Sequence, residues 1–301
     1  MKEVAGKVAF ITGGASGVGF GMAQAFCAAG MRVAIADIRS DHLDAAMAHF
    51  EGIGRRANVH PIRLDVTDRE ALSEAADETE RHFGHVHLVC NNAGINLFGD
   101  IAEATYDDWD WILGVNLGGV VNGVQTFLPR LLEHGEGGHI VNTASMAAFI
   151  AGPAAGIYTC SKFAVRGLSE ALRFSLAPRG IEVSVLCPGL VNSAIHESAR
   201  VRPARLASTS GSSDREFMAR LADLHARAGM TPLEVGDKVL RAIRRNDFYI
   251  FTHPEFKEEL REIFAEALEA LPEETPPPAR LAFEERRRAL KAQALLARRD
   301  G

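Results

Sequence analysis

A tyrosine and a lysine four residues apart, Tyr158 and Lys162, form the pair in this sequence best suited to move a proton. Residues i and i+4 lie on one face of a helix, so a helix here would set the phenol beside the ammonium. A free tyrosine titrates near pH ~10, and a fixed positive charge nearby favours the phenolate and lowers that pKa. A phenol adjusted in this way can act as a general acid or base. The alternative is an ordinary Tyr/Lys pair on a helix surface.

A glycine-rich turn, Gly13-x3-Gly17-x-Gly19, joins the apolar run at residues 7–11 to a helical stretch. Glycines in such a turn let the backbone approach a pyrophosphate, which binds at the helix N-terminus. The spacing differs from the common G-x-G-x-x-G pattern, so a plain glycine turn is an open alternative. The turn nevertheless follows a buried strand pattern, which favours dinucleotide binding.

Asp37 closes the second apolar run, 18 residues after Gly19. An acid at this place accepts hydrogen bonds from an adenosine ribose and repels a 2′-phosphate, which predicts NAD rather than NADP. Arg39, two residues further on, weakens that preference slightly. Asp65 and Val66 end the next run and are expected beside the adenine.

Short apolar runs alternate with helical patterns along the chain, which predicts a parallel sheet with helices on both faces. We therefore expect a single α/β domain, a Rossmann-type doubly wound sheet over residues 1–252, followed by a helical C-terminal extension over 253–301. The strands are predicted at residues 7–11, 32–36, 59–64, 86–90, 139–142, 182–186 and 248–251.

Residues 190–229 have weak periodicity and contain the serine-rich run Ser208–Ser213. Long irregular segments in α/β enzymes are usually active-site lids or disordered loops. The position of this segment, directly after Pro188-Gly189, favours a lid that orders over the substrate.

The composition excludes several classes of protein. A net charge of −6 gives no basic footprint for nucleic acid. The uncharged stretches 111–129 and 140–161 carry polar residues, so we expect no membrane span but a buried wall or a subunit interface. Four cysteines without a C-x-x-C pair, and a first apolar run too short for a signal peptide, predict a cytoplasmic protein with reduced thiols.

Four residues close together in the sequence are of the types that bind metal ions: His82, His85, His87 and Cys90. Residues 86–90 have the pattern of a strand, in which successive side chains face opposite ways. Cys90 then points away from His87, so we predict no metal there.

The chemistry-bearing motifs resemble, in order and spacing, those of the short-chain dehydrogenase/reductase family over about residues 5–252. They are Thr12-Gly13-x3-Gly17-x-Gly19, Asn91-Asn92-Ala93-Gly94, Asn116, Ser145, Tyr158-x3-Lys162 and Pro188-Gly189.

The resemblance implies a role for each member of a catalytic group. Tyr158 would be the acid/base, and Lys162 would lower its pKa and hold the nicotinamide ribose. Ser145 would hydrogen-bond the substrate oxygen, and Asn116 would hold a water that relays protons to Lys162. The resemblance also implies the residues that contact NAD: Gly13, Ser16, Gly17, Val18, Gly19, Asp37, Asp65, Val66, Asn92, Ala93, Gly94, Tyr158, Lys162, Pro188, Gly189 and Val191.

The substrate implied is a small molecule, a bulky secondary alcohol or ketone that is apolar or aromatic, because the residues after the motifs are mostly apolar. A weaker resemblance, in the run at 105–111 and the extended C-terminus, is to a bacterial subgroup that includes the Cα-dehydrogenases, which oxidise benzylic alcohols of lignin-derived aryl ethers. The residues expected in the substrate pocket are Asn96, Phe98, Met146, Phe149, Leu190 and His196.

Two other functions fit the same fold. One is an NADP-dependent carbonyl or 3-oxoacyl reductase, against which Asp37 argues. The other is a catalytically silent nucleotide-binding sensor or scaffold, since a fold does not fix a function. A silent protein has no need to keep Asn116, Ser145, Tyr158 and Lys162 together, and all four are present.

Overall fold

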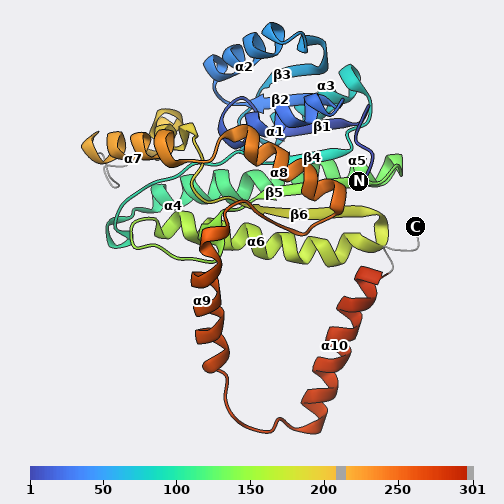
Figure 1. The fold of residues 1–301 in the computed structure, drawn as a ribbon, viewed down its shortest axis with the longest axis vertical. Coiled ribbons are helices and arrows are strands. Elements are labelled where there is room, and N and C mark those ends of the chain that lie inside the picture. Colours follow the sequence, from blue (N-terminus) through green and yellow to red (C-terminus); the bar gives the residue numbers. More distant parts are fainter. Residues whose placement is uncertain (208–214, 297–301) are drawn as a thin grey trace.

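The centre of the molecule is a parallel sheet in the order β3-β2-β1-β4-β5-β6-β7 (Figure 1). The computed structural model describes residues 1–207 and 215–296 of the chain. The predicted Rossmann-type doubly wound α/β fold is confirmed. Its strands are β1 Val8–Thr12, β2 Arg32–Asp37, β3 Val59–Arg63, β4 Leu88–Asn91, β5 Gly138–Thr143, β6 Ile181–Cys187 and β7 Tyr249–Phe251.

Helices cover both faces of the sheet, which is why β1 is apolar without a break. On β1, Ala9 and Ile11 pack with α1, α2 and α8, whereas Val8 and Phe10 pack with α3, α5 and α6. Because successive residues of a strand face opposite ways, one strand contributes to both cores. The helices of the body are α1 Gly17–Ala28, α2 Ser40–Gly52, α3 Arg69–Phe83, α4 Tyr106–Leu113, α5 Gly119–His134, α6 Gly156–Leu176, α7 Arg215–Ala228 and α8 Pro232–Arg245.

A single turn of π-helix, Gly114–Gly118, joins α4 to α5. The sequence predicts a bend in this long helical region at its glycines, and the irregular turn lies there. Such turns are frequent at functional sites because the extra residue re-aims a side chain. Here the side chain within the turn that is wholly buried is Asn116.

The combined run Tyr106–His134 is long and apolar enough, by length and composition, to cross a membrane. In the structure, 44% of its most apolar window is buried inside the molecule. Packing of α5 on the sheet, through residues such as Phe127 against Phe10, accounts for that apolar character.

The segment predicted to be irregular, 190–229, is largely helical, and that part of the prediction is wrong. It forms two 3₁₀ segments, η6 Ala194–Val201 and η7 Ala204–Leu206, and then α7. The serine-rich run at 208–213 and the charged residues in Arg215–Ala228 made the sequence pattern of the segment look irregular. The run Ser208–Ser213 lies outside the described residues. Residues 194–206 of the segment are anchored to the body by contacts beside the cavity.

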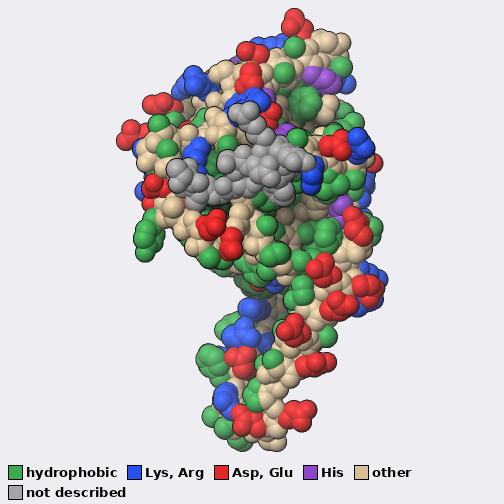
Figure 2. Space-filling view, turned by 90° about the vertical axis from the view of Figure 1, so that its left-hand side faces the viewer, with side chains coloured by type: hydrophobic (Ala, Val, Ile, Leu, Met, Phe, Trp, Pro, Cys, Tyr) green, Lys and Arg blue, Asp and Glu red, His purple; other side chains and the backbone are tan. Residues whose placement is uncertain are grey.

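The C-terminal part leaves the body as an arm of two helices, α9 Lys257–Glu269 and α10 Pro278–Leu296 (Figures 1 and 2). The turn between them contains Pro276 and Pro277, and a third proline, Pro278, begins α10. Proline fixes the backbone and is favoured in the first turn of a helix, so these residues end one helix and start the next.

Helices α1 and α8 cross so closely that only glycine fits at the contact. A Cβ on Gly21 would lie 1.8 Å from the Pro232 carbonyl oxygen, and one on Gly236 would lie 2.1 Å from the Gly21 oxygen. This contact holds α1, whose first turn faces the cavity described below, against the sheet.

Gly236→Ala is expected to destabilise the protein by more than about 2 kcal/mol, because backbone, not a flexible side chain, blocks the new methyl group. The matched control is Gly52→Ala, where a Cβ meets nothing within 4 Å at the exposed end of α2. That control should be neutral or stabilising by up to about 1 kcal/mol. Urea unfolding of both variants measures the difference; equal stabilities would contradict the close crossing.

Candidate active site

A cavity of about 800 Å³ opens at the carboxyl ends of the strands. It lies where the strand order reverses, between β1 and β4, which is the place where open α/β sheets bind ligands. Its volume falls in the range of small-molecule and cofactor sites. Residues from the ends of β1, β2, β5 and β6 line it, together with the amino end of α1.

The glycine turn brings bare backbone to the cavity wall. Gly13 and Gly17 have φ values of 61° and 49°, which other residues rarely adopt. A Cβ on Gly13 would stand 2.9 Å from the Ala93 Cα. The Asn92 amide donates to the backbone oxygens of Thr12 and Gly13 at 3.1 and 3.2 Å and fixes the turn.

The amino end of α1 fits a pyrophosphate. Its N-cap residue, Ser16, makes no side-chain capping hydrogen bond, and the first turn of the helix contains no acidic residue. The backbone N–H groups and the positive end of the helix dipole are therefore free to hold an anion. Ser16, Gly17 and Val18 all line the cavity.

Asp37 lies at the far end of the same cavity and is buried. Its carboxylate accepts hydrogen bonds from the backbone N–H groups of Ala15 at 3.3 Å and Arg39 at 3.1 Å. Burial raises the pKa of Asp37, while these two bonds act in the opposite direction. The guanidinium of Arg39 is held by two carboxylates, those of Asp41 and, at 2.5 Å, Glu197.

The catalytic side chains predicted from the sequence meet at one wall of the cavity, which Ser145, Tyr158 and Lys162 all line. Lys162 is only 3% exposed, and its Nζ donates a hydrogen bond to the Thr143 backbone oxygen at 3.1 Å. Burial lowers the pKa of Lys162 to about 8. Its Nζ lies 5.4 Å from the centre of the Tyr158 ring.

The pKa of Tyr158 differs from the expectation. Burial raises it, and a hydrogen bond with the Ser145 side chain lowers it by less. In the protein alone, desolvation of the phenol is therefore the dominant effect on its pKa. A phenol with a raised pKa stays protonated at neutral pH and is ready to donate.

Asn116 stands behind this wall and does not line the cavity. Its Oδ1 accepts from the Ile95 N–H at 2.9 Å, and its Nδ2 donates to the Ile95 oxygen and the Ser161 hydroxyl, each at 3.0 Å. A Cβ on Gly94 would stand 3.3 Å from Lys162 Nζ and 3.4 Å from Asn116 Oδ1. Glycine at position 94 thus keeps open the space between the two polar groups.

The cofactor residues predicted from the sequence are brought together almost completely. Gly19 is the exception: it packs beneath the turn, where a Cβ would be 2.0 Å from the Gly13 oxygen. The others line the cavity: Gly13, Ser16, Gly17, Val18, Asp37, Asp65, Val66, Asn92, Ala93, Gly94, Tyr158, Lys162, Pro188, Gly189 and Val191.

The residues predicted for the substrate pocket are not among those that line the cavity. Phe149 turns to the opposite side, under the Arg166 guanidinium at 3.9 Å and beside Phe251. Met146 is buried in the core with it. The full set outside the lining is Asn96, Phe98, Met146, Phe149, Leu190 and His196.

The substrate half of the cavity is instead lined by residues of the π-helix region and of the segment after β6. Most are apolar, and the polar ones include His225 of α7 and Arg205 of η7. No local motif marks these residues, since their approach depends on how the segment folds back. The apolar members are Ile95, Trp111, Val115, Ile195, Val201 and Leu206.

His225 is the polar residue of this half that sequence reasoning missed. It is buried, and burial lowers its pKa, so the imidazole is neutral at pH 7. Its Nδ1 has no hydrogen-bond partner within the described residues. A polar group of a ligand would satisfy it.

Three contacts tie the segment after β6 to the body. Glu197 pairs with Arg39 beside the cofactor end of the cavity, and the Ser198 hydroxyl accepts from the Asn96 N–H at 3.0 Å. Arg202 pairs with the buried carboxylate of Asp108 at 2.7 Å and covers the Trp111 ring. These contacts hold residues 194–206 against the body beside the cavity, and a lid that orders over the substrate stays a prediction.

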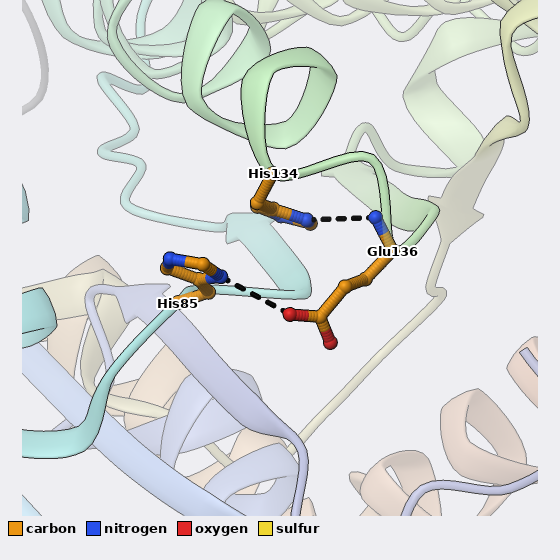
Figure 3. A group of neighbouring side chains, drawn as sticks. All are labelled: His85, His134 and Glu136. Atoms are coloured by element: carbon orange, nitrogen blue, oxygen red, sulfur yellow. Dashed lines mark hydrogen bonds and ion pairs between the residues drawn. The ribbon is translucent and has the colours of Figure 1, made fainter.

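A second group of polar residues, His85, His134 and Glu136, lies at the amino-terminal edge of the sheet, away from the cavity (Figure 3). Their potential ligand atoms are within 4.8 Å of one another. Both ring nitrogens of His134 are engaged with backbone groups, and the Glu136 carboxylate is shared by His85, His87 and Lys7. These bonds occupy the lone pairs that a metal needs, so the group is better described as an ion-pair network.

Of the four residues considered from the sequence as metal ligands, His85 and His87 both bond to Glu136, whereas the other two have different surroundings. Cys90 is buried in the core. His82 stacks on His60, with ring centres 4.3 Å apart.

Lys162→Met should raise the stability of the folded protein at neutral pH while destroying the site. Burial lowers the pKa of Lys162 from 10.5 to about 8. Below pH 8 the folded state therefore carries a cost of about 3 kcal/mol, at about 1.4 kcal/mol for each pKa unit. Between pH 8 and 10.5 the unfolded state binds more protons, so the unmodified protein gains stability as pH rises.

The difference in unfolding free energy between Lys162→Met and the unmodified protein is measured by urea unfolding at several pH values. The advantage of the variant should be largest below pH 8 and should shrink toward pH 10.5. Removal of an exposed lysine, Lys2→Met, is the control and should show no such dependence. A difference that is constant or grows over this range would contradict the buried-cation interpretation.

Comparison with known proteins agrees with this geometry. The family model of the short chain dehydrogenases matches residues 7–203. A protein named C alpha-dehydrogenase from Sphingobium sp. is 42% identical over 279 residues, which cover 92% of this chain and 90% of the relative.

Solved structures show the same likeness over nearly the whole chain. A short-chain dehydrogenase from Novosphingobium aromaticivorans is 45% identical with a TM-score of 0.85, covering 99% of this chain and 100% of its own. A short-chain dehydrogenase/reductase from Burkholderia phymatum, solved in complex with NAD, is 34% identical with a TM-score of 0.84, covering 92% of this chain and 99% of its own. The present chain therefore belongs to the short-chain dehydrogenase/reductase family, and it is an oxidoreductase that uses a nicotinamide cofactor on a small-molecule substrate.

Proposed function

We propose that this protein oxidises a bulky secondary alcohol with NAD, or reduces the corresponding ketone with NADH. The observation that carries the proposal is the division of the cavity: one wall holds Ser145, Tyr158 and Lys162, and the other is mainly apolar, with polar side chains that include Arg205 and His225. A reactive oxygen at the first wall would have its carbon substituents against the second.

The residues that would hold NAD are those whose geometry fits its parts. The amino end of α1 receives the pyrophosphate, Asp37 the adenosine ribose, and Lys162 the nicotinamide ribose. Bound in this way, the nicotinamide supplies hydride-transfer chemistry, and the chain supplies orientation and proton transfer. Oxidised nicotinamide is cationic, which would favour the phenolate of Tyr158 in the oxidative direction.

Proton transfer falls to Tyr158. In oxidation its phenolate accepts the proton of the alcohol, and in reduction its phenol donates a proton to the ketone oxygen. Ser145 hydrogen-bonds the phenol of Tyr158. In this proposal Ser145 also hydrogen-bonds the substrate oxygen and holds that oxygen within reach of the phenol. Because Lys162 is buried, water does not screen the charge of its ammonium, and that charge acts strongly on the site.

The substrate is inferred to be apolar or aromatic because Trp111, Ile95 and Leu206 line its half of the cavity. His225 offers one polar contact there. The relative named C alpha-dehydrogenase is consistent with oxidation at a carbon next to an aromatic ring. A nucleotide-binding scaffold would need neither a complete catalytic wall nor this second half.

A homo-oligomer, a dimer or tetramer, is part of the proposal. The outer face of α6 carries exposed apolar or small residues at helical spacing, Cys160, Phe163 and Gly167. Such a face allows close approach of a second helix, and family members pair in this way.

Tyr158→Phe should lower turnover by roughly 10²–10⁴, the usual contribution of a general acid–base. One oxygen is lost and the ring stays, so folding and NAD binding should persist. Turnover is followed by NADH absorbance on a panel of aryl secondary alcohols, and NAD binding by calorimetry. Tyr106→Phe, at a side chain that is 91% exposed, is the control and should leave turnover unchanged. Near-normal turnover of Tyr158→Phe would end the proposed mechanism.

The unmodified protein should prefer NAD, and Asp37→Ala should reduce that preference. Loss of a charge-assisted bond, worth about 1.5–3 kcal/mol, should lower kcat/KM for NAD by roughly 10- to 150-fold. Adding Glu197→Gln releases Arg39 from one of its two carboxylates, so the double variant should gain activity with NADP. Asp44→Ala, an exposed acid on α2, is the control. Equal kcat/KM for NAD and NADP in the unmodified protein would contradict the cofactor proposal.

A further inference from the structure

The first helix of the arm, α9, carries an apolar stripe that the body covers only at its base. Its residues recur at spacings of three and four, which is the pattern of a helix that packs along one face. Near the body, Leu260 packs on the core and the Phe264 ring meets Phe149. Further out, Leu268 is 67% exposed, and Leu271, two residues after the helix ends, is 62% exposed.

The second helix, α10, is exposed in the same way. Phe283 is 66% exposed, and Leu281 and Leu290 are exposed with it. It contacts the body near its carboxyl end, where Lys291 Nζ lies 5.0 Å from the Phe174 ring of α6. The two helices stand apart and form an open frame below α6 (Figure 1).

An isolated helix of this length is marginal in water, because most helical stability comes from packing of an apolar face. We therefore expect the apolar stripe on α9 and the exposed leucines of α10 to pack against a partner. Figure 2 shows hydrophobic, acidic and basic side chains together on the surface of the arm.

The charges on the two helices indicate what that partner is. Helix α9 has five glutamates, one lysine and one arginine, a net charge of −3. Helix α10 has four arginines, one lysine and two glutamates, a net charge of +3. The ion pairs within the arm join neighbours on one helix, Arg261 to Glu258 and Arg287 to Glu284. Each helix thus carries the charge that the other would attract.

We propose that the arm is an exchange element between two copies of this chain, in which α9 of one copy packs against α10 of the other. A two-fold axis repeats the contact, so each arm supplies one acidic and one basic helix to a closed pair. The apolar stripe supplies the buried area, and the opposite charges set which helix meets which.

Two variants with opposite charge changes test this contact. The first, Glu259→Lys, Glu262→Lys and Glu266→Lys, makes both helices of the arm basic. The second, Arg286→Glu, Arg287→Glu and Arg288→Glu, makes both acidic. Alone, each variant sets like charges against each other; mixed, each arm meets an arm of opposite charge. The control carries three reversals on the body, Glu51→Lys, Glu70→Lys and Glu74→Lys.

Assembly is measured by sedimentation velocity at low salt, and pairing in an equal mixture by native mass spectrometry with one variant mass-tagged. Each arm variant alone should assemble at least tenfold more weakly than the unmodified protein and the control. In the mixture, heteromers should exceed the half expected from random exchange. Turnover and circular dichroism should be unchanged, which separates this test from that of the catalytic proposal.

Two outcomes would overturn the proposal. One is arm variants that assemble as well as the unmodified protein. The other is weaker assembly of each variant without excess heteromers on mixing, which would mean that α9 and α10 pair within one chain. If the charge variants lose helicity, Leu268→Asp with Leu271→Asp serves instead and should weaken assembly; unchanged assembly of that variant would equally refute the exchange.

Discussion

The rest of the site depends on keeping one ammonium out of water. Lys162 reaches its position from the middle of α6, and its Nζ donates a hydrogen bond to the Thr143 oxygen at the end of β5. A buried cation is unfavourable unless polar groups surround it, so neighbouring elements must bring dipoles to one point. The π-helix that turns Asn116 inward, and the absence of a side chain at Gly94, serve that requirement.

This constraint explains why the site combines rigid and strained parts. The glycine turn, the Asn92 amide and the buried Asp37 fix the backbone around the cofactor half. The substrate half is fixed differently, by ion pairs that cross from the segment after β6 to α4 and to the end of β2. Backbone geometry therefore determines the shape of the cofactor half, and ion pairs between side chains determine the shape of the substrate half. Such side chains can be replaced more easily without loss of the fold.

The sequence was sufficient for those parts of the site that local spacing determines. The strand pattern, the glycine turn, Asp37 and the Tyr158–Lys162 pair each follow from residues close together in the chain. The sequence was not sufficient where the direction of a side chain depends on long-range packing. Phe149 points into the core, and His225 reaches the cavity from a helix, 67 residues beyond Tyr158 in the chain. The pKa of Tyr158 was misjudged because charge spacing is visible in a sequence, whereas desolvation is not.

The strand order has a consequence for how the chain is made. Strand β1 is central, but its second neighbour, β4, begins 76 residues after the end of β1. As the chain leaves the ribosome, β1, β2 and β3 can pair while one edge of β1 stays bare. An unpaired apolar edge invites pairing with other chains, so the nascent protein passes through a stage that is exposed to aggregation until β4 is made. The cavity, which straddles β1 and β4, is among the last features to form.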